Sequence, residues 1–298
     1  MNQKIRLKVP ATSANLGAGF DTMGIALNMY CYANFRATDH GLRISGCPEE
    51  FRGEDNMAVQ AFRAVENHIG VGHRGLEVEI DSDIPVARGL GSSAVMLVAG
   101  AFAANEIYGR PLSSAKLLEI TTAIEGHPDN LAPAIYGGLC ASVADPGKLP
   151  VSAHYEVSDK LKFVALVPDF PVSTAEARKA LPAEVSFKDA VFNLSRLSLL
   201  PMAFGSGDSR LIAAALDDRL HQPSRSKLIS GYDLIRTRAL DAGADGVVIS
   251  GSGPTILCVV QAEEAEGFVT RMSRVLSALE NNWNCYMLDC DKSGARVI

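Results

Sequence analysis

One glycine-rich segment decides the fold of this chain: Pro85-Val86-Ala87-Arg88-Gly89-Leu90-Gly91-Ser92-Ser93-Ala94. It follows a predicted strand and opens into residues 94–108, whose apolar side chains fall on every face of a helix. A helix that is apolar all round is enclosed by other elements. The first turn of a helix leaves backbone N–H groups unpaired and carries a partial positive charge, and glycines let an anion approach closely. The segment therefore predicts a phosphate-binding loop at the start of a buried helix.

Two better-known phosphate loops fit this segment poorly. The Walker pattern requires a lysine near its end, and no lysine follows Gly91. The dinucleotide pattern G-x-G-x-x-A is matched, but it requires a second strand with an acidic residue about 20 positions later. Residues 110–113 at that position are instead typical of a helix entrance. A tight strand-to-helix connection with serine as the helix cap remains the alternative explanation.

Composition excludes several classes of protein. The chain has 298 residues, 47% hydrophobic and 21% charged residues, and a formal net charge of −6. No basic stripe favours nucleic acid as a partner. The longest strongly apolar stretch, residues 94–104, is about half of the ~20 residues that a spanning helix needs, so we expect no membrane partner and a cytoplasmic location. The six cysteines lack C-x-x-C spacing, and we expect them to be core residues.

The order of predicted elements indicates two α+β domains, residues 1–155 and 156–298. Strands and helices alternate irregularly up to residue 143, and Asp145-Pro146-Gly147 then marks a boundary. After it the order is strand, helices, strand, strand, helix, strand, which is the split ferredoxin-like arrangement. Within this second part, residues 187–202 are predicted to form one helix.

Two more segments carry polar residues that a core does not require. Residues 10–21, PATSANLGAGFD, are predicted to be a long loop between strands that presents a binding surface. Residues 126–130, GHPDN, bring a histidine, an aspartate and an asparagine together. Each segment has an ordinary structural explanation alone, but their presence beside the glycine loop favours a shared site.

Four segments together resemble one family. PATSANLGAGFDTMGIAL, PVARGLGSSA, EGHPDNLAP and SGSGPT occur in this order across nearly the whole chain, and they resemble the motifs of the homoserine kinases among the GHMP small-molecule kinases. The resemblance implies a ribosomal-S5-like N-terminal domain and a ferredoxin-like C-terminal domain. It also implies transfer of the γ-phosphoryl group of ATP to the hydroxyl of L-homoserine, a step of threonine biosynthesis. A homodimer is the usual assembly of such a family.

The resemblance implies a nucleotide site that uses Mg²⁺. Glu125 would be the carboxylate ligand of the metal and Ser93 its hydroxyl partner, with Ser92 as the alternative. An alignment without a gap would select Glu119 in place of Glu125. The implied nucleotide-binding residues are Pro85, Val86, Ala87, Arg88, Gly89, Leu90, Gly91, Ser92, Ser93, Ala94 and Val95.

The resemblance also implies how the amino acid is bound. Asp21 would take the ammonium group, with Asn15 close by. Arg178, four residues after Thr174 on a helix, and Arg225 would take the carboxylate. The other substrate-binding residues are His127 and Asp129, and the residues implied in catalysis are Asn130, Glu125 and Arg178.

Alternatives remain for the chemistry and for the activity. Asn130 cannot accept a proton at neutral pH, so it would hold the reacting hydroxyl without acting as a base, and Asp129 is the competing candidate for a base. A different GHMP kinase, acting on an acid such as mevalonate, is disfavoured because mevalonate has no ammonium group for Asp21. A catalytically silent relative that binds a nucleotide or a protein is the other alternative.

Overall fold

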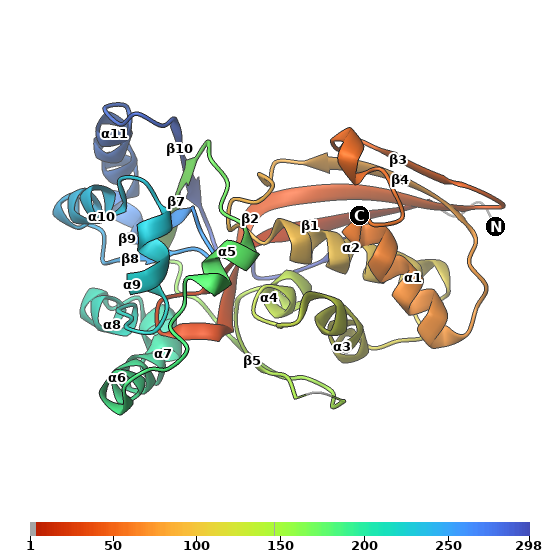
Figure 1. Cartoon of the computed structure of the whole chain (residues 1–298), viewed down its shortest axis with the longest axis horizontal. Helices are drawn as coiled ribbons and strands as arrows, with labels where there is room; N and C mark the ends of the chain where they lie inside the picture. Colours follow the sequence, from red (N-terminus) through yellow and green to blue (C-terminus); the bar gives the residue numbers. More distant parts are fainter. Residues whose placement is uncertain (1–3, 146) are drawn as a thin grey trace.

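The computed structural model describes residues 4–145 and 147–298 and contains two β-sheets with helices packed against them (Figure 1). Pro146, part of the predicted boundary, lies outside the described residues. Within the described ranges no helix is both long and apolar enough to cross a membrane. The predicted α+β fold with two parts is confirmed.

The first sheet is built on two long antiparallel strands, β1 (Lys4–Asn15) and β2 (Gly19–Thr38). Its strand order is β11-β1-β2-β4-β3, and β5 joins the N-terminal part of β2 and carries β6. Buried and half-buried side chains alternate along residues 29–37, as a sheet with one covered face requires. The other strands are β3 (Leu42–Ser45), β4 (Gly75–Ser82), β5 (Leu139–Val143), β6 (Val151–Tyr155) and β11 (Arg296–Val297).

The helix after the glycine loop, α2 (Ser92–Ile107), is enclosed as predicted. It packs against β1 and against three neighbouring helices. Its side chains are apolar on all sides because every side has a neighbour to pack against. The neighbours are α1 (Met57–Ile69), α3 (Ser114–Glu125) and α4 (Leu131–Tyr136).

The prediction of a long loop over residues 10–21 is wrong. Pairing of β1 with β2 continues to Ala14 and Gly24 and, after a register shift, to Asn15 and Gly19, and only residues 16–18 form the turn. The polar residues that suggested a loop are buried because they find partners across the fold. Thr12 reaches Asn130, for example, and Ser13 lies 2.8 Å from the hydroxyl of Ser250.

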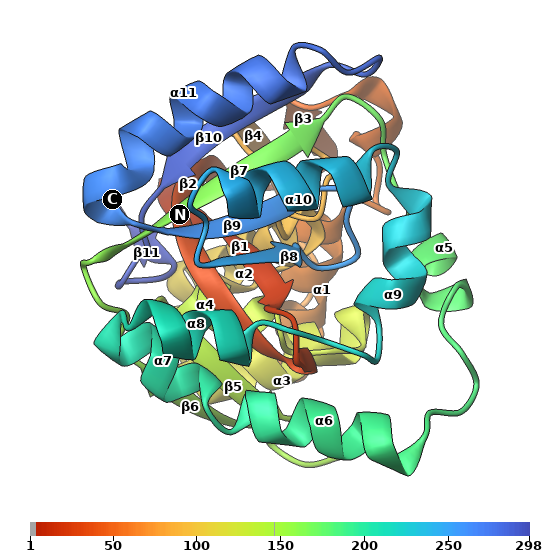
Figure 2. The ribbon, with the colours of Figure 1, turned by 90° about the vertical axis from the view of Figure 1, so that its left-hand side faces the viewer.

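The second sheet has the ferredoxin-like strand order β10-β7-β9-β8, and all its pairs are antiparallel. α10 (Tyr232–Asp241) and α11 (Ala265–Leu276) cover one face of it (Figure 2). The other face joins the core of the first sheet, in which Phe163 and Phe204 lie. The strands are β7 (Leu161–Pro168), β8 (Gly246–Ile249), β9 (Ile256–Gln261) and β10 (Trp283–Leu288).

Several short helices connect β7 to β8. The single helix predicted over residues 187–202 is two helices in the structure, α6 and α7. Pro201 explains the break, because proline has no N–H to donate and fits the first turn of a new helix. The helices are α5 (Thr174–Lys179), α6 (Phe187–Leu197), α7 (Leu200–Ser206), α8 (Ser209–Ala215) and α9 (Gln222–Arg225), and the 3₁₀ turns of the chain are η1 (Glu49–Phe51), η2 (Ser226–Leu228) and η3 (Ala262–Glu264).

The end of the chain returns to the first sheet. β11 pairs with β1, and the N–H of Asn28 donates to the carbonyl of Asp289 at 2.9 Å. The division of the chain at residues 155 and 156 stays a prediction. The loops of the two sheets meet at the start of α2, which positions the site described next.

Candidate active site

The predicted phosphate loop is held against a loop of the second sheet. Gly89 and Gly91 both have positive φ, +78° and +70°, which favours glycine. A Cβ atom on Gly89 would lie 2.4 Å from the carbonyl oxygen of Ser250. Ser250 Oγ donates to the carbonyl of Gly89 at 2.6 Å. The glycines therefore allow residues 250–255, the SGSGPT motif, to lie directly against the phosphate loop.

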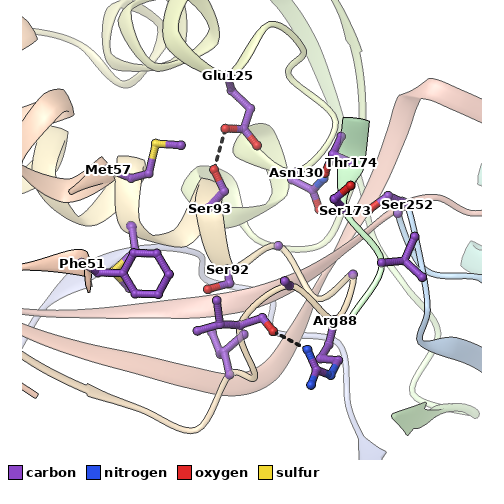
Figure 3. Close-up of a pocket in the computed structure, with 18 of the residues that line it drawn as sticks. Phe51, Met57, Arg88, Ser92, Ser93, Glu125, Asn130, Ser173, Thr174 and Ser252 are labelled. Carbon is purple, nitrogen blue, oxygen red and sulfur yellow. Dashed lines mark hydrogen bonds between the residues drawn. The ribbon is translucent and has the colours of Figure 1, made fainter. Parts of the chain in front are cut away.

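A cavity of about 630 Å³ runs along this loop. Ser92 and Ser93, at the start of α2, lie between its two ends (Figure 3). One end is mainly apolar and is lined by Cys47, Pro48, Phe51, Met57, Ile84 and Met96. The other end is polar and is lined by Asn15, Asp21, His127, Asp129, Asn130, Thr174, Arg178 and Arg225.

Four of the predicted nucleotide-binding residues do not line the cavity: Pro85, Leu90, Ala94 and Val95. The last three are fully buried, because their side chains belong to the core beneath the loop. The N–H of Val95 already donates to the carbonyl of Gly91 at 2.9 Å within the helix. The groups available to a ligand are therefore those before the first complete turn of α2.

A carboxylate and a hydroxyl meet beside this loop. Ser93 Oγ donates to Oε2 of Glu125 at 2.7 Å (Figure 3). Glu119, on the same helix, instead pairs with Lys116 at 2.5 Å and does not line the cavity. Mg²⁺ prefers oxygen ligands and is usually held by one or two carboxylates together with phosphates and water. The donor set of Ser93 and Glu125 fits that ion, and no cluster of three or more metal-binding side chains occurs in the described ranges.

Asn130 and its neighbours form a connected polar group at the N-terminus of α4. Thr12 Oγ1 donates to Oδ1 of Asn130 at 2.8 Å, which fixes the orientation of the amide, and the NH₂ group of Asn130 lies 3.4 Å from Oδ1 of Asp129. Oδ1 of Asp129 accepts from the N–H of Asn130 at 2.8 Å and lies 2.6 Å from Nδ1 of His127. This carboxylate raises the pKa of His127 above its ordinary value. Asp129 is 2% exposed, so its carboxylate is shielded from solvent.

Three predicted substrate-binding residues meet at the polar end. Arg178 donates from both terminal nitrogens to the two carboxylate oxygens of Asp21, each at 3.0 Å, and this pairing raises the pKa of Arg178. Arg225 is 2% exposed, and its Nη1 donates to the carbonyl of Gly251 at 2.9 Å. Burial lowers the pKa of Arg225. The opposite charges predicted for an amino-acid site therefore lie together, but Asp21 and Arg178 bind each other.

Asn15 and Thr174 line the cavity together with these charged residues. The side-chain NH₂ group of Asn15 donates to the carbonyl of Gly251 at 2.8 Å, and its Oδ1 accepts from the N–H of Asp21 at 2.9 Å. Thr174 is the first residue of α5, the helix that carries Arg178. Asn15 thus holds the backbone at Asp21, and Thr174 lies on the same wall of the cavity as Arg178.

The guanidinium of Arg88 contacts backbone carbonyls, whereas the resemblance implied that it binds a phosphate of the nucleotide. Its guanidinium donates to the carbonyls of Val86 at 3.0 Å, Pro168 at 3.0 Å and Asp169 at 2.6 Å. These bonds join the phosphate loop to the end of β7. A contact between Arg88 and a phosphate stays a prediction.

Sequence reasoning missed the apolar end of the cavity and the role of Thr12. Phe51, Met57 and Met96 come from a 3₁₀ turn and two helices, and no motif joins them. Thr12 lies within a quoted segment, but its contact with Asn130 spans 118 positions and leaves no local signal.

Comparison of the sequence with protein-family models and with known proteins identifies the family of this chain. The model described as "GHMP kinases N terminal domain" matches residues 56–138, and that described as "GHMP kinases C terminal" matches residues 203–278. A protein named homoserine kinase from Clostridium beijerinckii is 43% identical over 295 residues, which cover 99% of this chain and 98% of the relative. This chain belongs to the homoserine kinase family of the GHMP kinases.

Solved structures of homoserine kinases share the whole architecture. The crystal structure of homoserine kinase from Cytophaga hutchinsonii matches with a TM-score of 0.89 and 31% identity, over 100% of this chain and 98% of that one. The structure of a putative homoserine kinase from Listeria monocytogenes matches with a TM-score of 0.81 and 29% identity, over 99% of both chains. The homoserine kinase fold therefore accounts for the full length of the chain.

Proposed function

We propose that this chain transfers the γ-phosphoryl group of ATP to the hydroxyl of L-homoserine, with Mg²⁺, to give O-phospho-L-homoserine and ADP. This reaction is a step of threonine biosynthesis. The observation that carries the proposal is the charge pattern at the polar end of the cavity. One carboxylate, Asp21, and two guanidinium groups, Arg178 and Arg225, match the ammonium and carboxylate of an α-amino acid.

The nucleotide would occupy the other part of the cavity. The unpaired N–H groups at the start of α2 would bind its phosphates, since a helix N-terminus attracts anions. The apolar end, with Phe51 and Met57, offers a surface on which a purine base would pack. Ser93 and Glu125 would hold Mg²⁺, which neutralises phosphate charge when bound.

The transfer itself depends mainly on positioning. Phosphoryl transfer requires little covalent chemistry from the protein. The amide of Asn130, oriented by Thr12, would hold the substrate hydroxyl beside the phosphates. The carboxylate of Asp129 is already engaged by His127 and by the backbone of Asn130, which suits a residue that orients its neighbours.

We expect Asp129→Asn to lower kcat less than tenfold. The asparagine keeps an oxygen that can accept from the backbone N–H of Asn130, so the positioning network survives without the charge. Steady-state assays of ADP release at saturating substrates measure the effect. A general base contributes about 10²–10⁴-fold, so a loss in that range would instead assign Asp129 as the base.

Binding of the amino acid requires the Asp21–Arg178 pair to open. The substrate ammonium would replace Arg178 as the partner of Asp21, and the substrate carboxylate would replace Asp21 as the partner of Arg178. Arg225 remains free of a carboxylate partner among the ion pairs of the described residues. It is therefore the preformed cation of the site.

We expect Arg225→Leu to raise the KM for homoserine at least tenfold and to change the KM for ATP less than twofold. The leucine removes a buried cation next to Asp21 and Arg178 but leaves the start of α2 intact. Arg210→Leu is the matched control, because the Arg210 side chain is 93% exposed and pairs only with Asp208 among the described residues. Equal changes in both KM values would remove Arg225 from the carboxylate site.

A coupled ADP-release assay tests the activity directly. Homoserine, mevalonate, serine and a blank without acceptor are compared at equal concentration. We expect release with homoserine far above the blank. Release with mevalonate alone would overturn the proposal, and release at the blank rate with every acceptor would indicate a silent relative.

We also propose a cytoplasmic homodimer. All six cysteines are free thiols, which fits a reducing compartment. The exposed face of α6 carries Phe187, Val191 and Leu194 at helical spacing, an apolar surface of the kind that subunit contacts cover. Light scattering in solution tests the dimer, which requires twice the chain mass of 31.7 kDa.

A further inference from the structure

Residues 15–21, which comprise the turn between β1 and β2 and the strand residues beside it, have an unfavourable backbone. Three of these residues other than glycine have positive φ: Asn15 at 72°, Leu16 at 45° and Asp21 at 55°. A residue other than glycine adopts such a φ at an energetic cost and persists there only where the surroundings hold it in place. Asp21 therefore needs contacts from outside the turn to keep its position.

His221, which does not line the cavity, supplies two of these contacts. Its Nε2 lies 3.0 Å from the carbonyl oxygen of Gly17 at the centre of the turn. Its ring stacks on Phe20, with centroids 5.2 Å apart and planes at 27°. The chain just before it also closes on the turn, because a Cβ atom on Gly17 would lie 2.1 Å from the carbonyl oxygen of Leu216.

The hydrogen bonds around His221 define its protonation state. A carbonyl oxygen only accepts, so Nε2 must carry the hydrogen that Gly17 receives. Nδ1 is buried and has no hydrogen-bond partner in the described part of the chain, which suits an unprotonated nitrogen. Burial also lowers the pKa of His221. Asp218 fixes the backbone here, since its Oδ2 accepts from the N–H groups of His221 at 3.0 Å and Gln222 at 2.7 Å.

Phe20 links this histidine to the amino-acid site. The guanidinium carbon of Arg225 lies 5.0 Å from the centroid of the Phe20 ring, and that of Arg178 lies 6.0 Å from it. These distances are within the range of cation–π attraction. The Phe20 ring therefore lies near the guanidinium groups of both Arg178 and Arg225. Phe20 is also directly bonded to Asp21, whose carboxylate would bind the ammonium group of the amino-acid substrate.

We propose that His221 is a positioning residue for the amino-acid substrate. It holds the carbonyl of Gly17 and the ring of Phe20, and thereby sets the positions of Asp21 and Arg225. The inference rests on the proposed function and adds to it a residue behind the wall of the cavity. Because His221 lies on the side of the amino-acid site, its loss changes recognition of homoserine more than that of ATP.

Three substitutions of His221 separate its two contacts. His221→Leu removes both, His221→Gln keeps a donor for Gly17, and His221→Phe keeps a ring for Phe20. We expect His221→Leu to raise the KM for homoserine about tenfold with the KM for ATP changed less than twofold. The Gln and Phe variants should each recover part of that loss. His68→Leu, at an exposed histidine on α1, is the control and should match the unmutated chain.

Thermal unfolding and circular dichroism establish that each variant is folded. Phe20→Leu, outside the core clusters, gives a second test if His221→Leu does not fold, and it should show the same selective rise in the homoserine KM. Equal changes in both KM values, or an unchanged homoserine KM in the folded variants, would overturn the positioning role alone. An unmutated chain without homoserine-dependent ADP release would overturn the proposed function, and this inference with it.

Discussion

Gly91→Ala should lower kcat/KM for both substrates at least 100-fold. The new Cβ atom would lie 1.9 Å from Oγ1 of Thr12 and 3.2 Å from Oδ1 of Asn130. Oγ1 of Thr12 is hydrogen-bonded to Oδ1 of Asn130, so moving it away from the new Cβ atom would break that hydrogen bond. The substitution would therefore displace both the start of α2, the proposed phosphate site, and the amide of Asn130 that we propose to hold the substrate hydroxyl. Steady-state kinetics with each substrate varied in turn measures the loss.

Gly70→Ala is the matched control for this substitution. Gly70 has φ +72°, nearly the value of +70° at Gly91, and it also lies at a helix end. A Cβ atom there meets nothing within 4 Å. The control therefore carries the backbone strain alone, roughly 1–2 kcal/mol of stability, and should keep full activity. Activity of Gly91→Ala within threefold of the unmutated chain would show that this loop does not form the phosphate site.

Glu125→Gln should lower kcat/KM for ATP by about 10²–10³-fold and raise the Mg²⁺ concentration needed for half-maximal activity, as loss of a charged ligand does at a metal held by few protein groups. The glutamine keeps the size of the side chain and can still accept from Ser93, so the fold is preserved. Activity measured as a function of Mg²⁺ at fixed ATP reports the effect.

Glu119→Gln is the control, because Glu119 lies on the same helix but pairs with Lys116 away from the cavity. It should leave both the rate and the Mg²⁺ dependence within twofold of the unmutated chain. A loss at Glu119 with none at Glu125 would select the other alignment of the motif and would reassign the metal ligand.

Local chemistry made the glycine-rich loop at the start of an enclosed helix predictable, together with the polar motifs. Glycines before a helix that is apolar on all sides indicate an anion site whatever the rest of the fold, because unpaired N–H groups are a property of the helix end itself. The ferredoxin-like order of strands was also predictable, since hydrophobic periodicity is local. The helix break before Pro201 was also predictable, because proline lacks an N–H and fits only the first turn of a helix. The prediction of one helix over residues 187–202 was therefore wrong for a local reason.

Residues 10–21 show why polarity alone misled. A run of threonine, serine and asparagine indicates a loop when no partners are known, because burying unpaired polar groups is costly. Here the partners exist, but they lie far along the chain, at Asn130, Ser250 and Gly251. With them, the segment becomes buried strand.

The amino-acid sequence by itself determined the family, the glycine-rich loop before an enclosed helix and the identity of the charged residues, because short motifs and helix ends carry that information within a few positions. Only the tertiary structure decided how those residues meet. Arg178 binds Asp21 across 157 positions, and the apolar end of the cavity gathers side chains that no motif connects. Such contacts form when packing brings distant elements together, and the separation of two residues along the sequence does not determine the distance between their side chains in the fold.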